Sequence, residues 1–249
     1  FARRPAFTQP EIQRANLAEV ILRMKAFRLG EMATFPFLNP PAPAAIHGGY
    51  ALLYELGAVD DVRELTPLGR ELARLPVDPL LGRMLLQAQE EGTLPEVLVI
   101  AAGLSVPDPR ERPEGAREKA DQCHRAFAVA HSDFIGLLRI WRAMPAGVGG
   151  GGGRNALRKF CRNNFLSFLR MTEWRDLHRQ LCDAMSGDDE ARVAPLTREV
   201  NEDAIHRSIL AGLLGHIGVR DSRNTYKASG DRLVTLFPGS HVYERPVRR

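Results

Sequence analysis

Residues 155–181 have the sequence NALRKFCRNNFLSFLRMTEWRDLHRQL, which combines helical periodicity with an excess of basic side chains. The i, i+3, i+4, i+7 spacing of an amphipathic helix occurs twice. The two stripes consist of Leu157, Phe160, Cys161 and Phe168, and then of Trp174, Leu177, His178 and Leu181. Asn164 is an irregular polar member of the first stripe. The spacing predicts a pair of helices that pack through these stripes.

The opposite faces of the two expected helices are basic. Residues 154–179 hold seven basic and two acidic side chains, a balance of +5, whereas the whole chain has a formal net charge of +4. The basic residues are Arg154, Arg158, Lys159, Arg162, Arg170, Arg175 and Arg179. Such a surface suits a phosphate backbone. Charge alone favours a merely solvated basic face, because charge runs are common on helix surfaces.

The composition is typical of a soluble globular protein. The 249 residues, 44% apolar and 26% charged, suffice for one large domain or for two to three small ones. The three cysteines are far apart without metal-ligand spacing, which suggests reduced thiols in a cytoplasm. No apolar run approaches the roughly 18 residues of a membrane span. We therefore expect a cytoplasmic protein without membrane contact, and a piece of a longer one, because residue 1 is not Met.

The first part of the chain alternates helix signals with breaks. Thr8 begins a capping box that opens a first helix, which Gly30 would end. Residues 35–41 (FPFLNPP) are expected to be extended, because prolines exclude a helix there. A second helix is expected at about 44–56, before Gly57.

A short strand-like stretch at 58–65 precedes a third helix that begins at Thr66. The order helix, helix, short strand, helix predicts a winged-helix domain, and a plain helical bundle is the alternative. Residues 75–79 (LPVDP) form a stiff joint to a strongly helical region. There, Thr93 opens a second capping box and an almost entirely apolar, hence central, helix.

Two loops follow in this helical region. Residues 105–113 (SVPDPRERP) contain three prolines and two arginines that we expect to be exposed, and Ser132 caps the next helix. The five glycines at 149–153 predict a flexible connector. A phosphate-binding loop is excluded, because Arg154 follows where that motif needs Lys. The last helix is expected at about 205–216, and 232–237 begins a β domain.

Catalytic and metal-binding motifs are missing from the sequence. It contains no His-x-x-x-His, Cys-x-x-Cys or Gly-x-Ser-x-Gly pattern and no Gly-Lys-Ser/Thr loop. His178 is expected to be a packed, hydrogen-bonded core histidine. A buried Asn164 amide would cost roughly 1–3 kcal/mol unless paired, so it bonds a neighbouring loop or reaches a nucleotide. Arg110 and Arg112 could likewise contact phosphates or helix C-terminal carbonyls.

Several segments together resemble the C-terminal region of DEAH-box RNA helicases, of the bacterial HrpA type. They occur in the family's order over roughly residues 8–245. The segments are 65–85 (LTPLGRELARLPVDPLLGRML), 102–113 (AGLSVPDPRERP), 132–141 (SDFIGLLRIW), 160–169 (FCRNNFLSFL) and 205–218 (IHRSILAGLLGHIG).

This resemblance implies a mainly α fold. The end of the second RecA-like lobe (1–10) would precede a winged helix (11–75), a helical-bundle ratchet domain (76–218) and the beginning of an OB-fold (219–249). In the family, two motor lobes hydrolyse nucleoside triphosphate and move 3′ to 5′ along single-stranded RNA. ATP and magnesium would therefore bind only in the absent motor lobes, and this segment would hold no cofactor. The glycine run and the truncated barrel depart from the family pattern.

The resemblance implies an accessory nucleic-acid-binding region that forms part of the wall of the single-strand channel. Its expected partners are single-stranded RNA, with DNA as an alternative, and the motor lobes. The expected contacts are Arg110, Arg112, Arg158, Lys159, Arg162, Asn164 and Arg170. A scaffold that docks a helicase activator without touching nucleic acid is the main alternative. A winged-helix DNA-binding regulator is disfavoured, because 44–56 contains no Lys or Arg.

Overall fold

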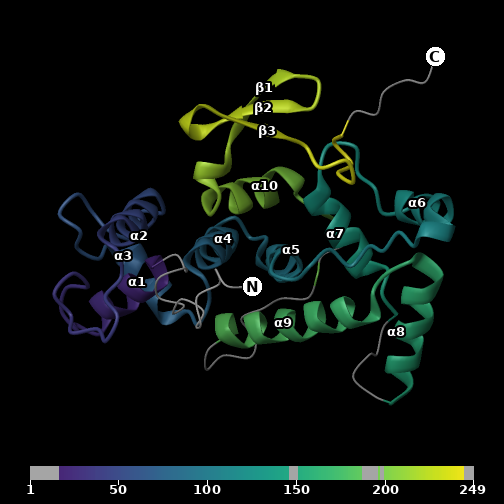
Figure 1. Ribbon diagram of the computed structural model, residues 1–249. Coiled ribbons are helices and arrows are strands. Elements are labelled where there is room, and N and C mark those ends of the chain that lie inside the picture. Colours follow the sequence, from purple (N-terminus) through teal and green to yellow (C-terminus); the bar gives the residue numbers. More distant parts are fainter. Residues whose placement is uncertain (1–16, 146–150, 187–195, 197–198, 244–249) are drawn as a thin grey trace, which may run out of the picture. The chain divides into compact units, whose positions relative to one another are not determined.

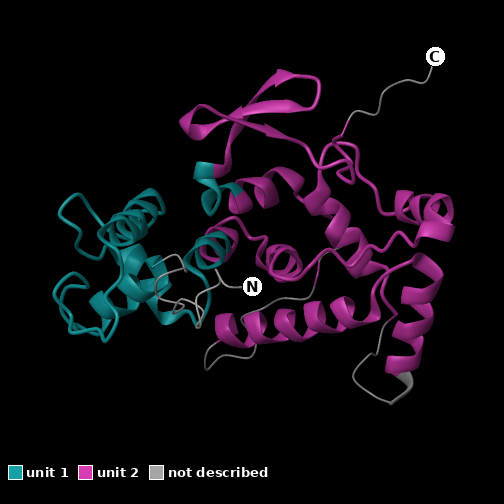
Figure 2. Ribbon diagram, in the orientation of Figure 1, with its two compact units in different colours: residues 1–84, 210–215 teal, residues 85–209, 216–249 magenta. Residues whose placement is uncertain are grey.

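The chain is mostly helical and has a small antiparallel sheet near its end, as the sequence predicts (Figure 1). The computed structural model describes residues 17–145, 151–186, 196 and 199–243. They divide into two compact units, the first within 1–84 and 210–215 and the second within 85–209 and 216–249 (Figure 2). No helix in these ranges is long and apolar enough to span a bilayer.

The first unit packs three short helices around one core. They are α1 (Ala18–Ala26), α2 (Pro43–Glu55) and α3 (Pro67–Arg74), and α1 packs against the other two. Ile21 and Leu53 are fully buried between them. Gly49 permits the close approach, because a Cβ there would lie 2.7 Å from Ile21 Cδ1. The Thr66 hydroxyl caps α3 by accepting from the Gly69 N–H at 3.0 Å.

Thr8 and its capping box lie outside the described residues. Two other predictions for this unit need correction. The first helix, α1, ends at Ala26, four residues before Gly30. The strand expected at 58–65 is reduced to a single bridge between Val59 and Leu65. A tight turn lies between the bridged residues, because the Asp60 carboxylate accepts from the backbone N–H of Val62 and of Glu64.

The second unit is built around α5 (Leu94–Leu104). Its further helices are α6 (Arg117–Arg125), α7 (Asp133–Arg142), α8 (Gly151–Asn164), α9 (Phe168–Ser186) and α10 (Glu202–Ala211). The boundary between the two units falls within α4 (Pro79–Glu90), after Met84. α5 packs against α7 and α9. Trp174 of α9 is fully buried and donates its Nε1–H to the Val99 carbonyl at 2.8 Å. The central position predicted for this helix is therefore confirmed.

The two predicted helix caps of this unit have opposite outcomes. Ser132 accepts from the Ile135 N–H at 3.2 Å and caps α7. Thr93 makes no cap hydrogen bond, and its hydroxyl lies instead 3.3 Å from the Ser208 hydroxyl. The capping box is thus wrong, because the Thr93 hydroxyl accepts no cap hydrogen bond and the Thr93 N–H donates to the Ala88 carbonyl at 2.8 Å.

The glycine run and the last helix also differ from expectation. Residues 146–150 lie outside the described ranges, but Gly151–Gly153 form the first turn of α8 rather than a connector. The last helix, α10, ends at Ala211, and a 3-10 turn, Leu214–His216, follows. Gly212 and Leu213 separate the two. A Cβ there would lie 2.3 Å from the Leu80 carbonyl oxygen.

The sheet consists of β1 (Gly218–Ser222), β2 (Thr225–Ala228) and β3 (Arg232–Thr235) in that order. Both pairs are antiparallel, with Val219 opposite Lys227 and Tyr226 opposite Val234. The strand expected at 232–237 thus ends two residues early. That residues 219–249 begin an OB-fold stays a prediction.

Candidate nucleic-acid interface

The break between α8 and α9 lies before Phe168, whereas the sequence pattern placed Phe168 in the stripe of the first helix. Phe165 has a φ of 52°, a left-handed conformation that ends α8. The 105–113 loop pairs with this break. The Phe165 carbonyl accepts from the Glu111 N–H at 2.8 Å, and the Pro109 carbonyl accepts from the Ser167 N–H at 2.7 Å. Phe168 therefore begins α9 and does not continue the apolar stripe of α8.

The break also divides the basic charge unequally. Helix α8 contains Arg154, Arg158, Lys159 and Arg162 and no acidic residue, a charge of +4. Helix α9 contains Arg170, Arg175 and Arg179, but also Glu173, Asp176 and Asp183, so its charge is zero. The cationic surface predicted for 154–179 is therefore concentrated on α8.

The cations of α8 form a row on its exposed face. Arg154, Arg158 and Arg162 are spaced four residues apart and share one side of the helix. The Arg158 guanidinium lies 4.9 Å from the centre of the Phe168 ring, and that of Arg154 lies 5.9 Å from it. Lys159 and Arg162 are exposed and have no ion-pair partner among the described residues. These two cations are free to take an anionic ligand.

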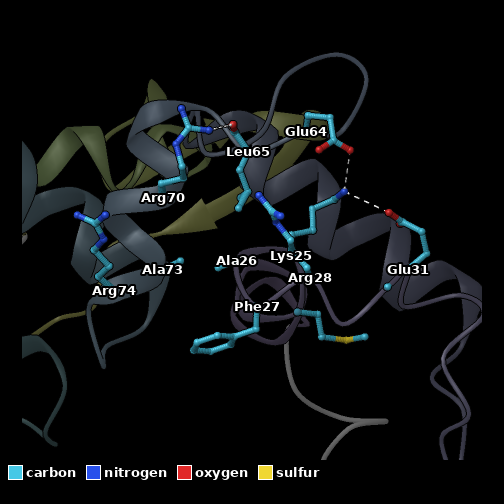
Figure 3. A pocket seen from close by; sticks show the side chains of 12 residues that line it. Lys25, Ala26, Phe27, Arg28, Glu31, Glu64, Leu65, Arg70, Ala73 and Arg74 are labelled. Atoms are coloured by element: carbon cyan, nitrogen blue, oxygen red, sulfur yellow. Dashed lines mark hydrogen bonds and ion pairs between the residues drawn. The ribbon is translucent and has the colours of Figure 1, made fainter.

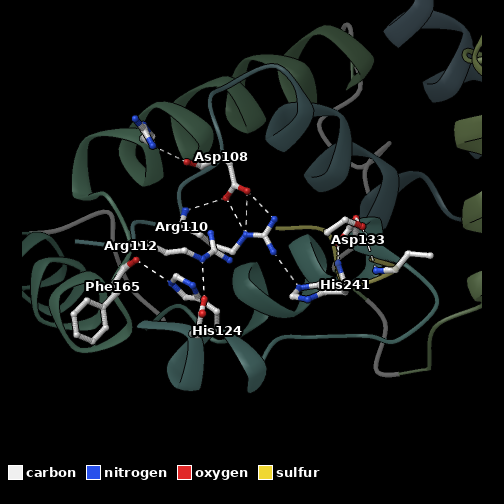
Figure 4. A network of polar contacts seen from close by, with 11 residues as sticks. Asp108, Arg110, Arg112, His124, Asp133, Phe165 and His241 are labelled. Atoms are coloured by element: carbon white, nitrogen blue, oxygen red, sulfur yellow. Dashed lines mark hydrogen bonds and ion pairs between the residues drawn. The ribbon is translucent and has the colours of Figure 1, made fainter. Parts of the chain in front are cut away.

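Arg110, which we expected to be exposed, is instead held inside a polar network (Figure 4). Its side chain is only 11% exposed, and its Nη2 donates to Asp108 Oδ2 at 2.7 Å. Its Nη1 lies 3.0 Å from His241 Nε2. Burial alone would raise the pKa of Asp108, but the hydrogen bonds and charge of Arg110 outweigh it and lower the pKa. The expectation of an exposed Arg110 is wrong, because residues distant in sequence enclose it.

Three further candidates also have protein partners. Arg170 donates from Nη1 to the Asp108 carbonyl at 2.8 Å, and Arg112 donates from Nε to Asp121 Oδ1 at 2.8 Å. The Asn164 amide donates to the Phe160 carbonyl of its own helix at 2.9 Å, which neither expected alternative included. The predicted site thus separates into an exposed row on α8 and a buried network around the 105–113 loop. The role of all seven residues in nucleic-acid binding stays a prediction.

Comparison with known proteins places this geometry in a family. Residues 50–77 match the winged-helix part of the helicase associated domain (HA2), and residues 78–137 match its ratchet-like part. The chain is 39% identical over its whole length to the ATP-dependent RNA helicase HrpA of Escherichia coli, of which it covers 19%. The chain therefore matches the helicase-associated region of DEAH-box RNA helicases.

Other relatives agree with this assignment. The HrpA homolog of Haemophilus influenzae is 37% identical over 98% of the chain, which covers 19% of that protein. The probable ATP-dependent RNA helicase DHX35 of Homo sapiens is 30% identical over the whole chain, which covers 34% of it. The chain thus matches the C-terminal, helicase-associated region of a HrpA-type enzyme and spans about a fifth of the bacterial relatives. The domain boundaries 1–10, 11–75, 76–218 and 219–249 stay predictions.

Two histidines of the helicase-associated region are packed in the second unit. The ring of His178 lies 4.5 Å from that of Trp141 and 3.6 Å (Nε2) from Cys182 Sγ, which confirms the predicted packed histidine. His124 was not predicted; it is 2% exposed, and its Nε2–H donates to the Phe165 carbonyl at 3.0 Å. Its place on α6, one residue before the helix end, gave no signal in the sequence. Within the described ranges, no group of three or more His, Cys, Asp or Glu residues could hold a metal ion.

The first unit of the helicase-associated region contains a separate open cavity of about 800 Å³ (Figure 3). Lys25 bridges two carboxylates on its wall, Glu31 at 3.2 Å and Glu64 at 3.3 Å. Arg28 and Arg74 also line the cavity and have no ion-pair partner in the described part of the chain. The Phe27 side chain on its wall is 69% exposed. An apolar ring beside unpaired cations is a surface suited to an acidic partner.

Proposed function

We propose that this helicase-associated region binds single-stranded RNA through the exposed face of α8, as an accessory part of an ATP-dependent DEAH-box helicase. One observation carries the proposal: α8 presents four cations and no acidic residue. RNA is the expected ligand because the bacterial and human relatives are named as RNA helicases. Single-stranded DNA is the alternative.

The chemistry of the α8 face suits a strand that must be held without regard to sequence. Arginine and lysine neutralise backbone phosphates, which carry no sequence information. The Phe168 ring beneath Arg158 restricts that guanidinium and so reduces the ordering that binding requires. Arg170 and Arg110 would act indirectly: Arg170 ties the start of α9 to the 105–113 loop, and Arg110 pairs with Asp108 within that loop. These two arginines would not themselves touch the strand.

We further propose that the region grips the strand as one wall of the channel and leaves hydrolysis to motor lobes elsewhere in the protein. ATP and magnesium would bind in those lobes, which fits the missing phosphate-binding motif in this sequence. A nucleoside triphosphate hydrolysis assay of the present chain tests this division. Turnover by the chain alone would contradict it.

The binding proposal is tested by titrating a labelled single-stranded RNA with the chain and with Lys159→Glu/Arg162→Glu. The double variant should bind at least about tenfold more weakly, because the loss of even one charge-assisted contact costs about 1.5–3 kcal/mol and 1.4 kcal/mol is tenfold. Unchanged affinity at low salt would contradict the assignment. The same titration with DNA of equal sequence measures the preference between the two nucleic acids.

A protein-docking scaffold is the second candidate function, favoured by the cavity beside Phe27 in the first unit. Its occupant would be an acidic segment with an apolar side chain, because the cavity combines an exposed ring with Arg28 and Arg74. The two candidates differ in one measurable respect. A scaffold without nucleic-acid contact predicts no salt-sensitive association with RNA.

A further inference from the structure

A second cavity lies in the second unit, between α6 and the segment that follows the sheet. Its volume is about 320 Å³, within the range of small-molecule pockets. The lining includes Arg112, Asp121, His124, Arg125, His241 and Tyr243. Apart from Arg112, none of these residues belongs to the interface predicted from the sequence. The cavity therefore calls for its own explanation.

Two guanidinium groups in this lining have unused hydrogen-bond donors. Arg112 gives its Nε–H to Asp121, and no other partner of its guanidinium is present among the described residues. Arg125 is exposed and has no ion pair within the same ranges. A guanidinium offers five N–H donors in a planar fork that matches the oxygens of a phosphate. Most of the N–H donors of these two guanidinium groups therefore have no acceptor among the described residues.

The carboxylates around the cavity are already engaged. Asp121 accepts from Arg112, and Asp108 pairs with Arg110 behind the wall. Asp133 binds the segment after the sheet with both oxygens, because Oδ2 accepts from the Ser240 hydroxyl at 2.5 Å and Oδ1 from the His241 N–H at 2.9 Å. These bonds fix the cavity wall without neutralising Arg125.

The two histidines that line the cavity have lowered pKa values. Burial lowers the pKa of His124, and the nearby charges of Arg112 and Arg110 lower it further. Burial likewise lowers the pKa of His241, with Arg110 as the next contributor. His124 Nδ1 is buried and has no hydrogen-bond partner within the described part of the chain. The charges of Arg110 and Arg112 thus add to the effect of burial at both histidines, and a bound anion would offset those charges.

We propose that this cavity binds a phosphate group through the guanidinium groups of Arg112 and Arg125. The inference rests on the proposed function, since a nucleic-acid backbone is one source of such a group and a free nucleotide is the other. His124 links the cavity to the nucleic-acid interface, because its Nε2–H bonds the Phe165 carbonyl at the break between α8 and α9. The site would hold a phosphate beyond those contacted by α8.

The test follows histidine resonances by NMR while the full chain is titrated with inorganic phosphate. Bound phosphate should raise the pKa of His124 and of His241, since it offsets the guanidinium charges. Arg125→Gln should weaken phosphate binding about tenfold, and Arg112→Gln/Arg125→Gln should weaken it further. Arg125 is exposed, so its replacement leaves the fold intact even if Arg112→Gln does not. Lys119→Gln, an exposed change on the same helix outside the cavity lining, is the matched control.

Two competitors then identify the source of the phosphate. Displacement of inorganic phosphate by an RNA oligonucleotide without terminal phosphates would indicate the backbone, and displacement by uridine monophosphate alone would indicate a nucleotide. The proposal would be overturned if phosphate did not shift the histidine resonances, or if it shifted them equally in the native chain and in Arg112→Gln/Arg125→Gln. Lys159→Glu/Arg162→Glu should leave phosphate binding unchanged. A failure of the α8 interface is therefore distinguishable from a failure of this site.

Discussion

The salt dependence of RNA binding can be worked out from the cations of α8. Each phosphate that a protein neutralises on a single strand contributes about 0.7 to the slope of log affinity against log salt. If all four α8 cations contact phosphates, the slope is about −2.8. Lys159→Gln/Arg162→Gln leaves two contacts and a slope of about −1.4. A fourfold rise in salt should then weaken the native chain about 50-fold and the variant about sevenfold.

The assay is fluorescence anisotropy of a labelled single-stranded RNA at several salt concentrations. The matched control is Arg23→Gln/Arg179→Gln, which removes the same charge from two arginines that already pair with Glu19 and Asp176. The control should keep the native slope, because long-range charge alone does not release counterions. Equal slopes for all three proteins would refute the reasoning, and a reduced slope in the control would show that total charge decides.

Three further predictions concern the fold. Gly69→Ala should lower the free energy of unfolding by about 1–3 kcal/mol, because its Cβ would lie 2.0 Å from the Ala58 carbonyl oxygen. Gly115→Ala, where a Cβ would meet open space, should leave the free energy of unfolding unchanged. Equal denaturant midpoints for the two variants would contradict this prediction. Ser132→Ala should cost about 1 kcal/mol through the lost cap of α7, measured likewise. Burial raises the pKa of Tyr50 to about 12, so the contribution of the neutral phenol to stability is complete below pH 10 and is lost as the pH rises through 12. A spectroscopic titration should show one tyrosine that ionises near pH 12 and that Tyr50→Phe removes. A titration that Tyr50→Phe leaves unchanged would contradict this.

The elements that local signals define were predictable from the sequence. Thr66 as N-cap and Pro67 as the first helical residue predict the start of α3, and Ser132 as N-cap predicts the start of α7. The burial of α5 follows from its nearly unbroken apolar sequence. Each of these features depends on residues within one or two turns of one another, which a single sequence displays.

The features that were predicted wrongly depend on contacts with residues far away in the sequence. Arg110 is enclosed by His241, 131 residues away, so no local pattern could reveal its burial. The break at Phe165 is fixed by hydrogen bonds to the 105–113 loop, and it removed Phe168 from the stripe in which Asn164 was an irregularity. The Thr93 hydroxyl lies beside Ser208, 115 residues on, and not at the helix start. Tertiary contacts overrode the local preference in each case.

The central claim is that the exposed face of α8, rather than the whole basic stretch, contacts RNA. The most direct measurement is NMR mapping of the chain during titration with a single-stranded RNA. We predict perturbed signals for Arg158, Lys159 and Arg162, and unchanged signals for Arg175 and Arg179 on the neutral helix α9. Perturbations confined to α9 or to the first unit, with α8 unchanged, would contradict the account.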